Sequence, residues 1–136
     1  MEGLESWVSR LVDATNGHDL DALVACFDEG YVNECPVHPA RNFTGREQVR
    51  RNWEQIFKHV PDIHATVLHE AYGPGTAWTE WEMRGTRADG GEHLMRGVVI
   101  FQVAGEQATS CRFYVEPVDA GTMTVGEAVA ALVVGQ

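Results

Sequence analysis

The clearest candidates for acid-base chemistry are polar side chains that alternate along the segment ATSCRFYVEP, near the end of the chain. Successive side chains of a β-strand point to opposite faces, so Arg112, Tyr114 and Glu116 share one face. Phe113 and Val115 share the other. If the polar face turned inward, its groups could share hydrogen bonds and position a ligand carbonyl or carboxylate for proton transfer. We favour this orientation; in the alternative, the apolar face lines the interior and the polar face meets solvent or a partner.

A second carboxylate stands beside a guanidinium in the segment TAWTEWEMRGTR. Glu82 and Arg84 would lie on one strand face, with Trp81 on the other. This carboxylate and guanidinium, side by side on one face, are a further option for a functional site, and Glu82 is a candidate ligand-binding residue. Such pairs are also common as cross-strand ion pairs on solvated faces.

Six histidines are spread through the chain, and none pairs with another at the H-x-x-x-H spacing of a helical metal site. No Cys-His cluster accompanies them, so we expect neither a metal nor an organic cofactor. His38 lies between Pro36 and Pro39, near the expected mouth of the cone, which makes it the histidine best suited to acid-base catalysis, a common role of imidazole side chains. The alternative for His38 is a solvent-exposed position in a loop.

Composition narrows the class of protein. The net charge of −10 and the pI near 4.9 argue against nucleic acid and anionic membrane surfaces as partners, because polyanions would be repelled. The first residues lack the charged and apolar regions of a signal peptide, and no run of 18 apolar residues occurs. Three cysteines without a C-x-x-C spacing fit a reducing compartment. We therefore expect a cytoplasmic protein.

Apolar residues at helical spacing predict three amphipathic helices in the first half of the chain. The first ends at Asn16-Gly17, the second is capped by Asp19, and the third begins at a capping-box match, Thr44 to Glu47, and is terminated by Pro61. The apolar stripes are Leu4, Trp7, Val8, Leu11 and Val12, then Leu20, Leu23, Val24 and Phe27, then Val49, Trp53, Ile56, Phe57 and Val60.

Four segments read as strands because they are rich in β-branched and aromatic residues and are separated by glycine-containing turns. They are IHATVLHEAY, TAWTEWEMRGTR, HLMRGVVIFQV and ATSCRFYVEP. Trp53 and Phe57 on the third helix, with Trp78 or Trp81 on the sheet, are candidate walls of a binding pocket. After the strands, a capping-box match from Thr124 to Glu127 predicts a short apolar helix, with a strand or a frayed tail as the alternative.

The order of these segments resembles the nuclear transport factor two-like superfamily, and within it the SnoaL-like branch of polyketide cyclases and ketosteroid isomerases. The resemblance is carried by NGHDLDALVACF, FTGREQVRRNW, FKHVPDI, WTEWEMRGT, LMRGVVIFQV and RFYVEPVD. It implies one α+β domain over residues 1–136, with a core at about 4–119 and a C-terminal helix or arm at 120–136. The expected shape is a cone-shaped roll, in which three N-terminal helices pack in a strongly curved antiparallel sheet of four or more strands around an apolar pocket.

The same resemblance places the ketosteroid isomerase base at Cys35 and the helix-one tyrosine at Leu11, so both chemical groups are missing. Glu34 is one residue away from the base position, and a shift of one residue in an extended segment turns a side chain to the opposite face, unless the segment is bulged. SnoaL-like cyclases use an acidic residue on the last strand with a nearby histidine, and neither Asp nor His lies within that strand here. A third comparison is an epoxide hydrolase of the superfamily, which uses acidic groups and an arginine to activate water. The residues that could do so here are Glu82, Arg84 and Glu116.

These observations predict a protein that binds a small apolar molecule, polyketide-like or steroid-like, and that isomerises or cyclises a carbonyl compound without a metal or cofactor. The alternative is a non-catalytic ligand-binding or dimerisation domain, and epoxide hydrolase-like water activation comes third. The predicted catalytic residues are Tyr114, Arg112, Glu116 and His38, and the predicted ligand-binding residues are Trp53, Phe57, Trp78, Trp81, Cys35 and Glu82. Because the strands carry apolar residues on both faces, as at Val98 and Val99, we expect a homodimer.

Overall fold

The computed structural model describes residues 2–134 of the chain, and its elements follow the predicted order. The helices are α1 (Glu2–Asn16), α2 (Leu20–Ala25), α3 (Arg46–His59) and α4 (Val125–Val134), with a 3-10 turn η1 (Pro39–Arg41). The strands are β1 (Phe27–Glu34), β2 (Phe43–Thr44), β3 (His64–Gly73), β4 (Thr76–Thr86), β5 (Glu92–Ala104) and β6 (Gln107–Pro117).

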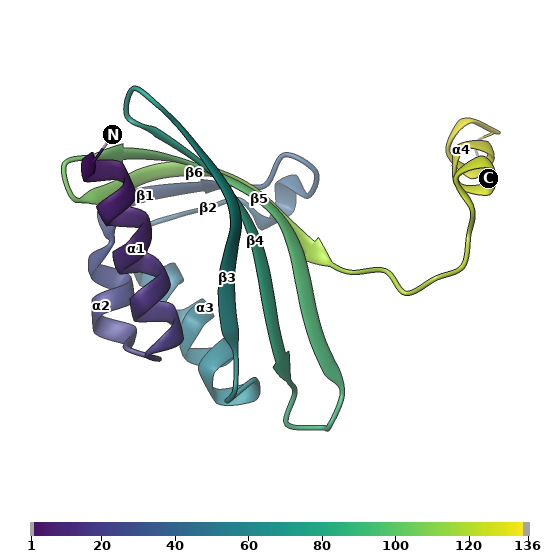
Figure 1. The fold of residues 1–136 in the computed structure, drawn as a ribbon, viewed down its shortest axis with the longest axis horizontal. Helices are drawn as coiled ribbons and strands as arrows, with labels where there is room; N and C mark the ends of the chain where they lie inside the picture. The colour runs from purple at the N-terminus through teal and green to yellow at the C-terminus, as the bar shows by residue number, and fades with distance from the viewer. Residues whose placement is uncertain (1, 135–136) are drawn as a thin grey trace.

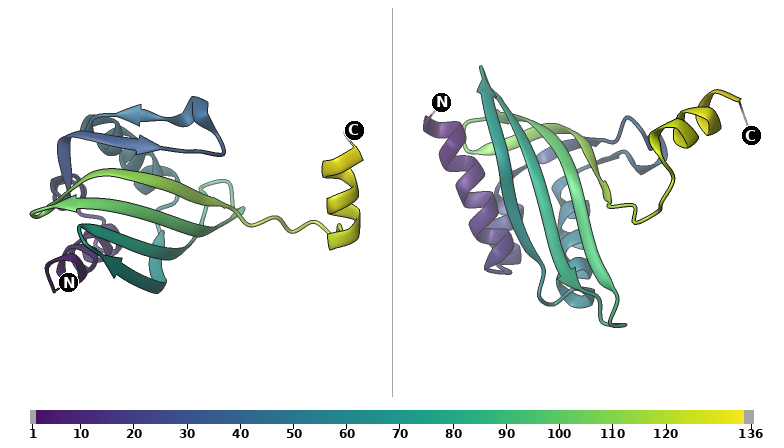
Figure 2. Two further views of the ribbon diagram at one scale, coloured as in Figure 1. Left: turned by 90° about the horizontal axis from the view of Figure 1, so that it is seen from above. Right: turned by 45° about the vertical axis from the view of Figure 1, so that its right-hand side comes forward.

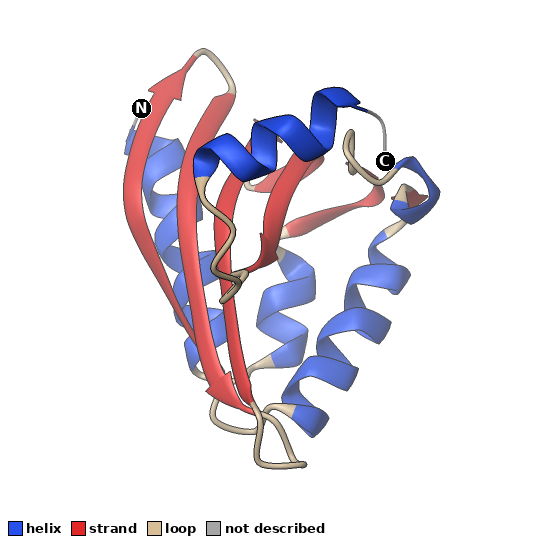
Figure 3. Cartoon of the chain, turned by 90° about the vertical axis from the view of Figure 1, so that its right-hand side faces the viewer, coloured by secondary structure: helices blue, strands red, loops and turns tan. Residues whose placement is uncertain are grey.

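The six strands form one curved sheet in the order β2-β1-β6-β5-β4-β3. Neighbouring strands are antiparallel except for β1 and β6, which run parallel. Helices α1, α2 and α3 lie on the concave side of this sheet (Figure 1), and Figure 3 shows helices and strands converging toward the β4–β5 turn. The predicted α+β cone-shaped roll with four or more strands is confirmed; the sheet has six strands, and β1 and β6 form a parallel pair that was not predicted.

The second helix is shorter than predicted. Asp19 caps it as expected, accepting a hydrogen bond from the Ala22 N–H over 3.1 Å, but the helix ends at Ala25. Phe27, which we assigned to the helix, begins β1 and is paired with Ala108 of β6. Its ring is buried and meets the ring of Trp7 edge-on at 6.3 Å, so tertiary packing overrides the local helical spacing.

The capping box predicted for the third helix does not form. Thr44 is paired with Val32 in the β1–β2 ladder, and the residue that caps α3 is Gly45, at φ 99°. The Gly45 N–H donates to the Tyr31 carbonyl over 2.6 Å, which ties the start of α3 to β1. This sheet contact takes the place of the side-chain cap.

Strands β5 and β6 approach closely at Gly97 of β5. This glycine lies opposite Trp81 on β4 and Val115 on β6, and its φ of +152° is a conformation that side-chain-bearing residues rarely adopt. A Cβ atom at this position would overlap the carbonyl oxygen of Tyr114. The close approach of the two strands therefore requires glycine, and it helps to curl the sheet around the helices.

The last helix stands apart from the cone, at the end of an extended segment (Figures 1 and 2). The predicted capping box is present here: the Thr124 N–H donates to Glu127 Oε1 over 2.8 Å, and the Glu127 N–H donates to Thr124 Oγ1 over 3.3 Å. Apolar side chains of this helix are exposed, among them Leu132 at 79%. Within residues 2–134, no helix is both long enough and apolar enough to cross a membrane.

Candidate functional site

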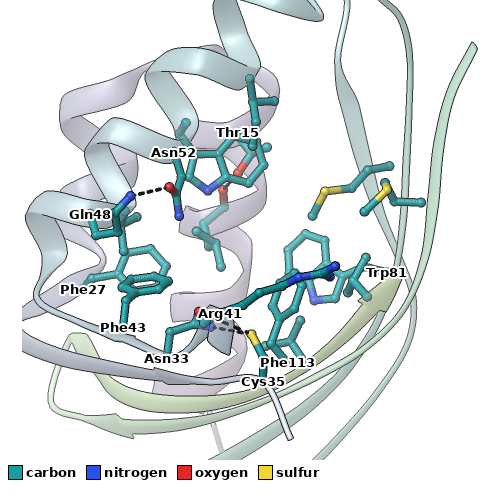
Figure 4. Close-up of a pocket in the computed structure, with 18 of the residues that line it drawn as sticks. Thr15, Phe27, Asn33, Cys35, Arg41, Phe43, Gln48, Asn52, Trp81 and Phe113 are labelled. Atoms are coloured by element: carbon teal, nitrogen blue, oxygen red, sulfur yellow. Dashed lines mark hydrogen bonds between the residues drawn. The ribbon is translucent and has the colours of Figure 1, made fainter. Parts of the chain in front are cut away.

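A cavity of about 460 Å³ opens between the helices and the concave face of the sheet (Figure 4). One wall comes from α1, α3 and β1, and the facing wall comes from β4, β5 and β6. The apolar lining includes Leu11, Val49, Ile56, Met83, Met95 and Val99. This volume lies in the range of about 300–1,000 Å³ that is typical of small-molecule sites.

Two tryptophans line the cavity from opposite sides. Trp53 projects from α3, in the apolar stripe three residues before Ile56, and Trp81 projects from the inner face of β4. The indole N–H of Trp81 donates to Thr79 Oγ1 over 2.7 Å, so its polar end is satisfied inside the wall. Both rings can therefore present aromatic surface to a ligand.

A buried polar cluster lies along β1 and the neighbouring strand β6, and consists of Tyr31, Asn33, Cys35 and Cys111. The Tyr31 hydroxyl lies 2.9 Å from Asn33 Oδ1, and the Cys111 thiol lies 3.2 Å from the same oxygen. The Asn33 amide nitrogen in turn donates to Cys35 Sγ over 3.4 Å. Burial raises the pKa of Tyr31 well above its ordinary range and that of Cys111 to about 11, so both groups are neutral at physiological pH.

An amide pair lies on the α3 wall. Gln48 Nε2 donates to Asn52 Oδ1 over 2.7 Å, and Gln48 Oε1 accepts from Arg51 over 2.8 Å. This arrangement uses the amide oxygen of Asn52 and leaves its NH₂ group directed at the cavity, as Figure 4 shows. Asn52 thus presents hydrogen-bond donors to a ligand.

Two basic side chains complete the lining. Arg41, at the end of η1, extends over the cavity, and its side chain is 61% exposed, which places it at the mouth (Figure 4). His93 lies at the start of β5, and burial, together with the nearby charge of Arg87, lowers its pKa, so the imidazole is neutral at pH 7. No Asp or Glu of the described chain lines the cavity.

The structure corrects the favoured orientation of β6. Phe113 and Val115 line the cavity, whereas Arg112 and Tyr114 lie on the other face of the strand, outside the cavity lining. Arg112 forms an exposed ion pair with Glu34, 3.7 Å apart, so Glu34 also points away from the cavity as expected. The apolar face is the one that meets the concave interior, because burying it removes Phe113 and Val115 from water.

His38 and Glu116 lie together near the mouth. His38 Nε2 is 3.0 Å from Glu116 Oε1, and Glu116 Oε2 is 3.9 Å from Arg41. Neither His38 nor Glu116 is part of the cavity lining, and both side chains are more than one-third exposed. The two predicted catalytic groups are thus brought together outside the cavity, where Glu116 contacts the guanidinium that does line it.

The predicted ligand-binding residues divide into two groups. Trp53, Trp81 and Cys35 line the cavity, and their contact with a ligand stays a prediction. Phe57 lies outside the lining, with its ring stacked on His18 at 4.7 Å.

The other two, Trp78 and Glu82, are on the outer face of β4. Trp78 is 50% exposed, and Glu82 forms ion pairs with Arg84 and Arg96, at 2.8 and 2.9 Å. These two arginines hold the pKa of Glu82 below its ordinary value. The acidic and basic groups considered for water activation therefore lie outside the cavity.

Several lining residues with polar side chains were missed from the sequence, among them Arg41, Asn52 and His93. Asn52 had a signal, because it lies three residues after Val49 and four before Ile56, in the apolar stripe of α3. A polar residue in such a stripe indicates either a buried hydrogen bond or a binding group. Nothing in the local sequence marked Arg41, which reaches the cavity only through the fold of the loop after β1.

Among residues 2–134, no group of three or more His, Cys, Asp or Glu side chains could hold a metal ion. The polar groups of the lining are suited to hydrogen bonding of a ligand oxygen. Arg41 adds a positive charge at the mouth. The arrangement can therefore bind an apolar molecule and orient it through its oxygen atoms.

Comparisons with known proteins agree with this architecture. The family model described as SnoaL-like domain matches residues 8–111. No curated protein sequence matches the chain.

Three solved structures are similar. A candidate isomerase from Bacillus subtilis gives a TM-score of 0.74 at 15% identity, covering 85% of this chain and 88% of its own. Wild-type IdmH from Streptomyces antibioticus, a candidate polyketide cyclase, gives a TM-score of 0.71 at 19% identity, and the match covers 82% of this chain and 91% of IdmH. A protein with a ketosteroid isomerase-like fold from Catenulispora acidiphila DSM 44928, in complex with trimethylamine, gives a TM-score of 0.68 at 18% identity. This match covers 79% of this chain and 84% of the other. At these identities the similarity establishes the fold.

Proposed function

The chain belongs to the SnoaL-like domain family, and from this starting point we propose that it binds a small, largely apolar carbonyl compound, polyketide-like or steroid-like, in the cavity of the cone. The observation that carries the proposal is the cavity itself, about 460 Å³ in volume and lined mainly by aliphatic, aromatic and methionine side chains. The candidate polyketide cyclase among the similar folds supports a polyketide-like ligand.

The binding energy would come from the apolar walls. Burying a ring system against Trp53, Trp81 and Phe113 removes apolar surface from water, which contributes roughly 25 cal/mol per Å². The donors of Asn52 and Arg41 would then fix the orientation of the ligand oxygens, because an unpaired carbonyl in this setting would cost free energy.

A cavity-filling variant tests the proposal. Ile56 lines the cavity from α3, whereas its neighbour Gln55 is exposed and lies outside the lining. Calorimetric titration with a panel of aromatic and steroid ketones should give saturable binding to the wild type, loss of at least about tenfold in affinity for Ile56→Trp, and no change for Gln55→Trp. If no member of the panel binds, or if Ile56→Trp binds as the wild type does, the proposed function is wrong.

A second candidate function, enolisation of the bound carbonyl compound, is favoured by His93. Its lowered pKa keeps the imidazole neutral at pH 7, so it can accept a proton from the carbon next to the carbonyl. The carbonyl oxygen would take up the developing negative charge, and the donors of Asn52 and Arg41 would stabilise it. The proton would return to another carbon for isomerisation.

Exchange of hydrogen for deuterium at the carbon next to the carbonyl measures this step directly. In D₂O, nuclear magnetic resonance should show exchange of a bound ketone with the wild type and with His69→Gln, since His69 is 82% exposed on β3. His93→Gln should reduce the exchange rate by about 100-fold or more. Exchange that persists in His93→Gln would exclude His93 as the proton acceptor, and binding without exchange in the wild type would favour a non-catalytic ligand-binding domain.

A further inference from the structure

The amide oxygens that line the cavity already have hydrogen-bond donors. Asn52 Oδ1 accepts from Gln48, and Asn33 Oδ1 accepts from Tyr31. The Thr15 hydroxyl donates to the Leu11 carbonyl over 2.7 Å. The lining groups that are still available to a ligand are chiefly hydrogen-bond donors. The cavity therefore favours ligand atoms that accept hydrogen bonds.

The charge of the lining also favours a ligand with electron-rich oxygen atoms. Arg41 is the one permanently charged side chain among the described residues that line the cavity, in a protein whose formal charge is −10. Its positive charge also reaches the interior wall: burial raises the pKa of the Cys35 thiol, and the guanidinium of Arg41 opposes that rise. Arg41 thus brings a positive charge to the mouth of the cavity in an acidic protein, beside the single carboxylate of Glu116.

Arg41 is only loosely engaged by the protein. Its closest carboxylate is that of Glu116, 3.9 Å away, and the other oxygen of Glu116 is 3.0 Å from His38. The Arg41 and Glu116 side chains are 61% and 44% exposed, so solvent screens their attraction. The planar guanidinium therefore keeps donors free for a bidentate contact with another carboxylate.

We propose that the natural ligand carries a carboxylate, which Arg41 binds at the mouth while the apolar body of the ligand fills the cavity. This inference rests on the proposed function and narrows the ligand class from carbonyl compounds in general to apolar carboxylic acids. Asn52 donates to an oxygen deeper in the cavity, and Glu116 weakens the attraction because its carboxylate competes for Arg41.

Two matched compounds test the inference: 2-naphthoate and 2-acetylnaphthalene, which share the ring system and differ in charge. The wild type should bind 2-naphthoate about tenfold more tightly than the ketone, as expected for a charge-assisted hydrogen-bonded pair. Arg41→Met should remove this preference by weakening naphthoate binding alone. Arg41→Lys, which keeps the charge without the planar fork, should retain part of it.

Glu116→Gln should act in the opposite direction. Removing the competing carboxylate should strengthen naphthoate binding by about threefold and leave the ketone unchanged. Arg41 and Glu116 are largely exposed, so all three variants should keep the unfolding midpoint of the wild type, which thermal denaturation checks.

The two hypotheses fail in different ways. Equal binding of both compounds, unchanged by Arg41→Met, would overturn the carboxylate inference and leave the proposed function intact. If neither compound binds to the wild type, or if both bind unchanged to Ile56→Trp, the cavity is not the binding site and both proposals are wrong.

Discussion

The indole N–H of Trp81 donates a hydrogen bond to the hydroxyl oxygen of Thr79, two residues earlier on the inner face of β4, over 2.7 Å. Thr79 Oγ1 in turn donates to the Val99 carbonyl of the neighbouring strand over 2.8 Å. Both side chains are almost completely buried, with exposed fractions of 1% for Thr79 and 2% for Trp81. This relay fixes the tilt of the indole ring that forms one wall of the cavity.

Thr79→Val should therefore destabilise the protein more than its small change in shape suggests. Valine matches threonine in volume but leaves the buried Trp81 N–H without an acceptor, which costs about 1–3 kcal/mol of unfolding free energy. Urea denaturation measures the difference. Thr109→Val is the control, because the Thr109 hydroxyl is on an exposed stretch of β6, and its replacement should change stability by less than about 0.5 kcal/mol. Equal effects of the two variants would contradict the relay.

Gly97→Ala should be strongly destabilising, because the new methyl group would overlap the Tyr114 carbonyl and the backbone would have to leave its φ of +152°. Overpacking and backbone strain together predict a loss of about 2–4 kcal/mol. Gly73→Ala serves as the matched control, since nothing lies within 4 Å of a Cβ at that strand end. Denaturation midpoints that coincide for the two variants would show that the sheet does not need glycine at position 97.

Much of the fold could be predicted from the sequence because its signals are local. Helical stripes, glycine turns and the order of the segments specified α1, α3 and four of the six strands. Cys35, the position expected for the isomerase base, and Leu11, the position expected for the helix-one tyrosine, both line the cavity. The two-residue strand β2 is too short to leave a pattern.

The candidate site was harder to predict, because strand alternation tells which side chains share a face but not which face turns inward. On β6 both faces carry large groups, Phe113 on one and Tyr114 on the other, and only the curvature of the whole sheet decides between them. A charge-balanced polar face such as that of Arg112 with Glu34 is stable in water, so it needs no interior partner. Arg41 was missed for a related reason: its place at the mouth depends on the non-repetitive loop before β2.

Stability should fall on mild acidification through His93. Burial makes the folded protein resist protonation of this imidazole, so its pKa is lower in the folded state than in the unfolded chain. The unfolded state binds the proton first, and the stabilising contribution, complete above about pH 6.5, is lost as the pH falls through the folded-state pKa. His93→Gln should flatten the unfolding free energy between pH 7 and about pH 5.5, measured by urea titration. His69→Gln, at an exposed position, should leave the slope unchanged, and an unchanged slope in His93→Gln would contradict the assignment.

The outer face of the sheet predicts the oligomeric state. Strand register places Trp78 opposite Ile100 and Val98 opposite Tyr114 on the outer face. Glu80 lies opposite Val98, and Arg112 lies opposite Ile100, so charged side chains border these four large ones. Because Trp78 is half exposed there, we expect two copies to pack these faces together as a homodimer.

Trp78→Glu should weaken association by about 2 kcal/mol or more, roughly thirtyfold in the dissociation constant, as measured by sedimentation equilibrium. Leu132→Glu on α4 should leave the dimer intact. A monomeric wild type would exclude the interface, and loss of the dimer in Leu132→Glu alone would assign it to the C-terminal helix.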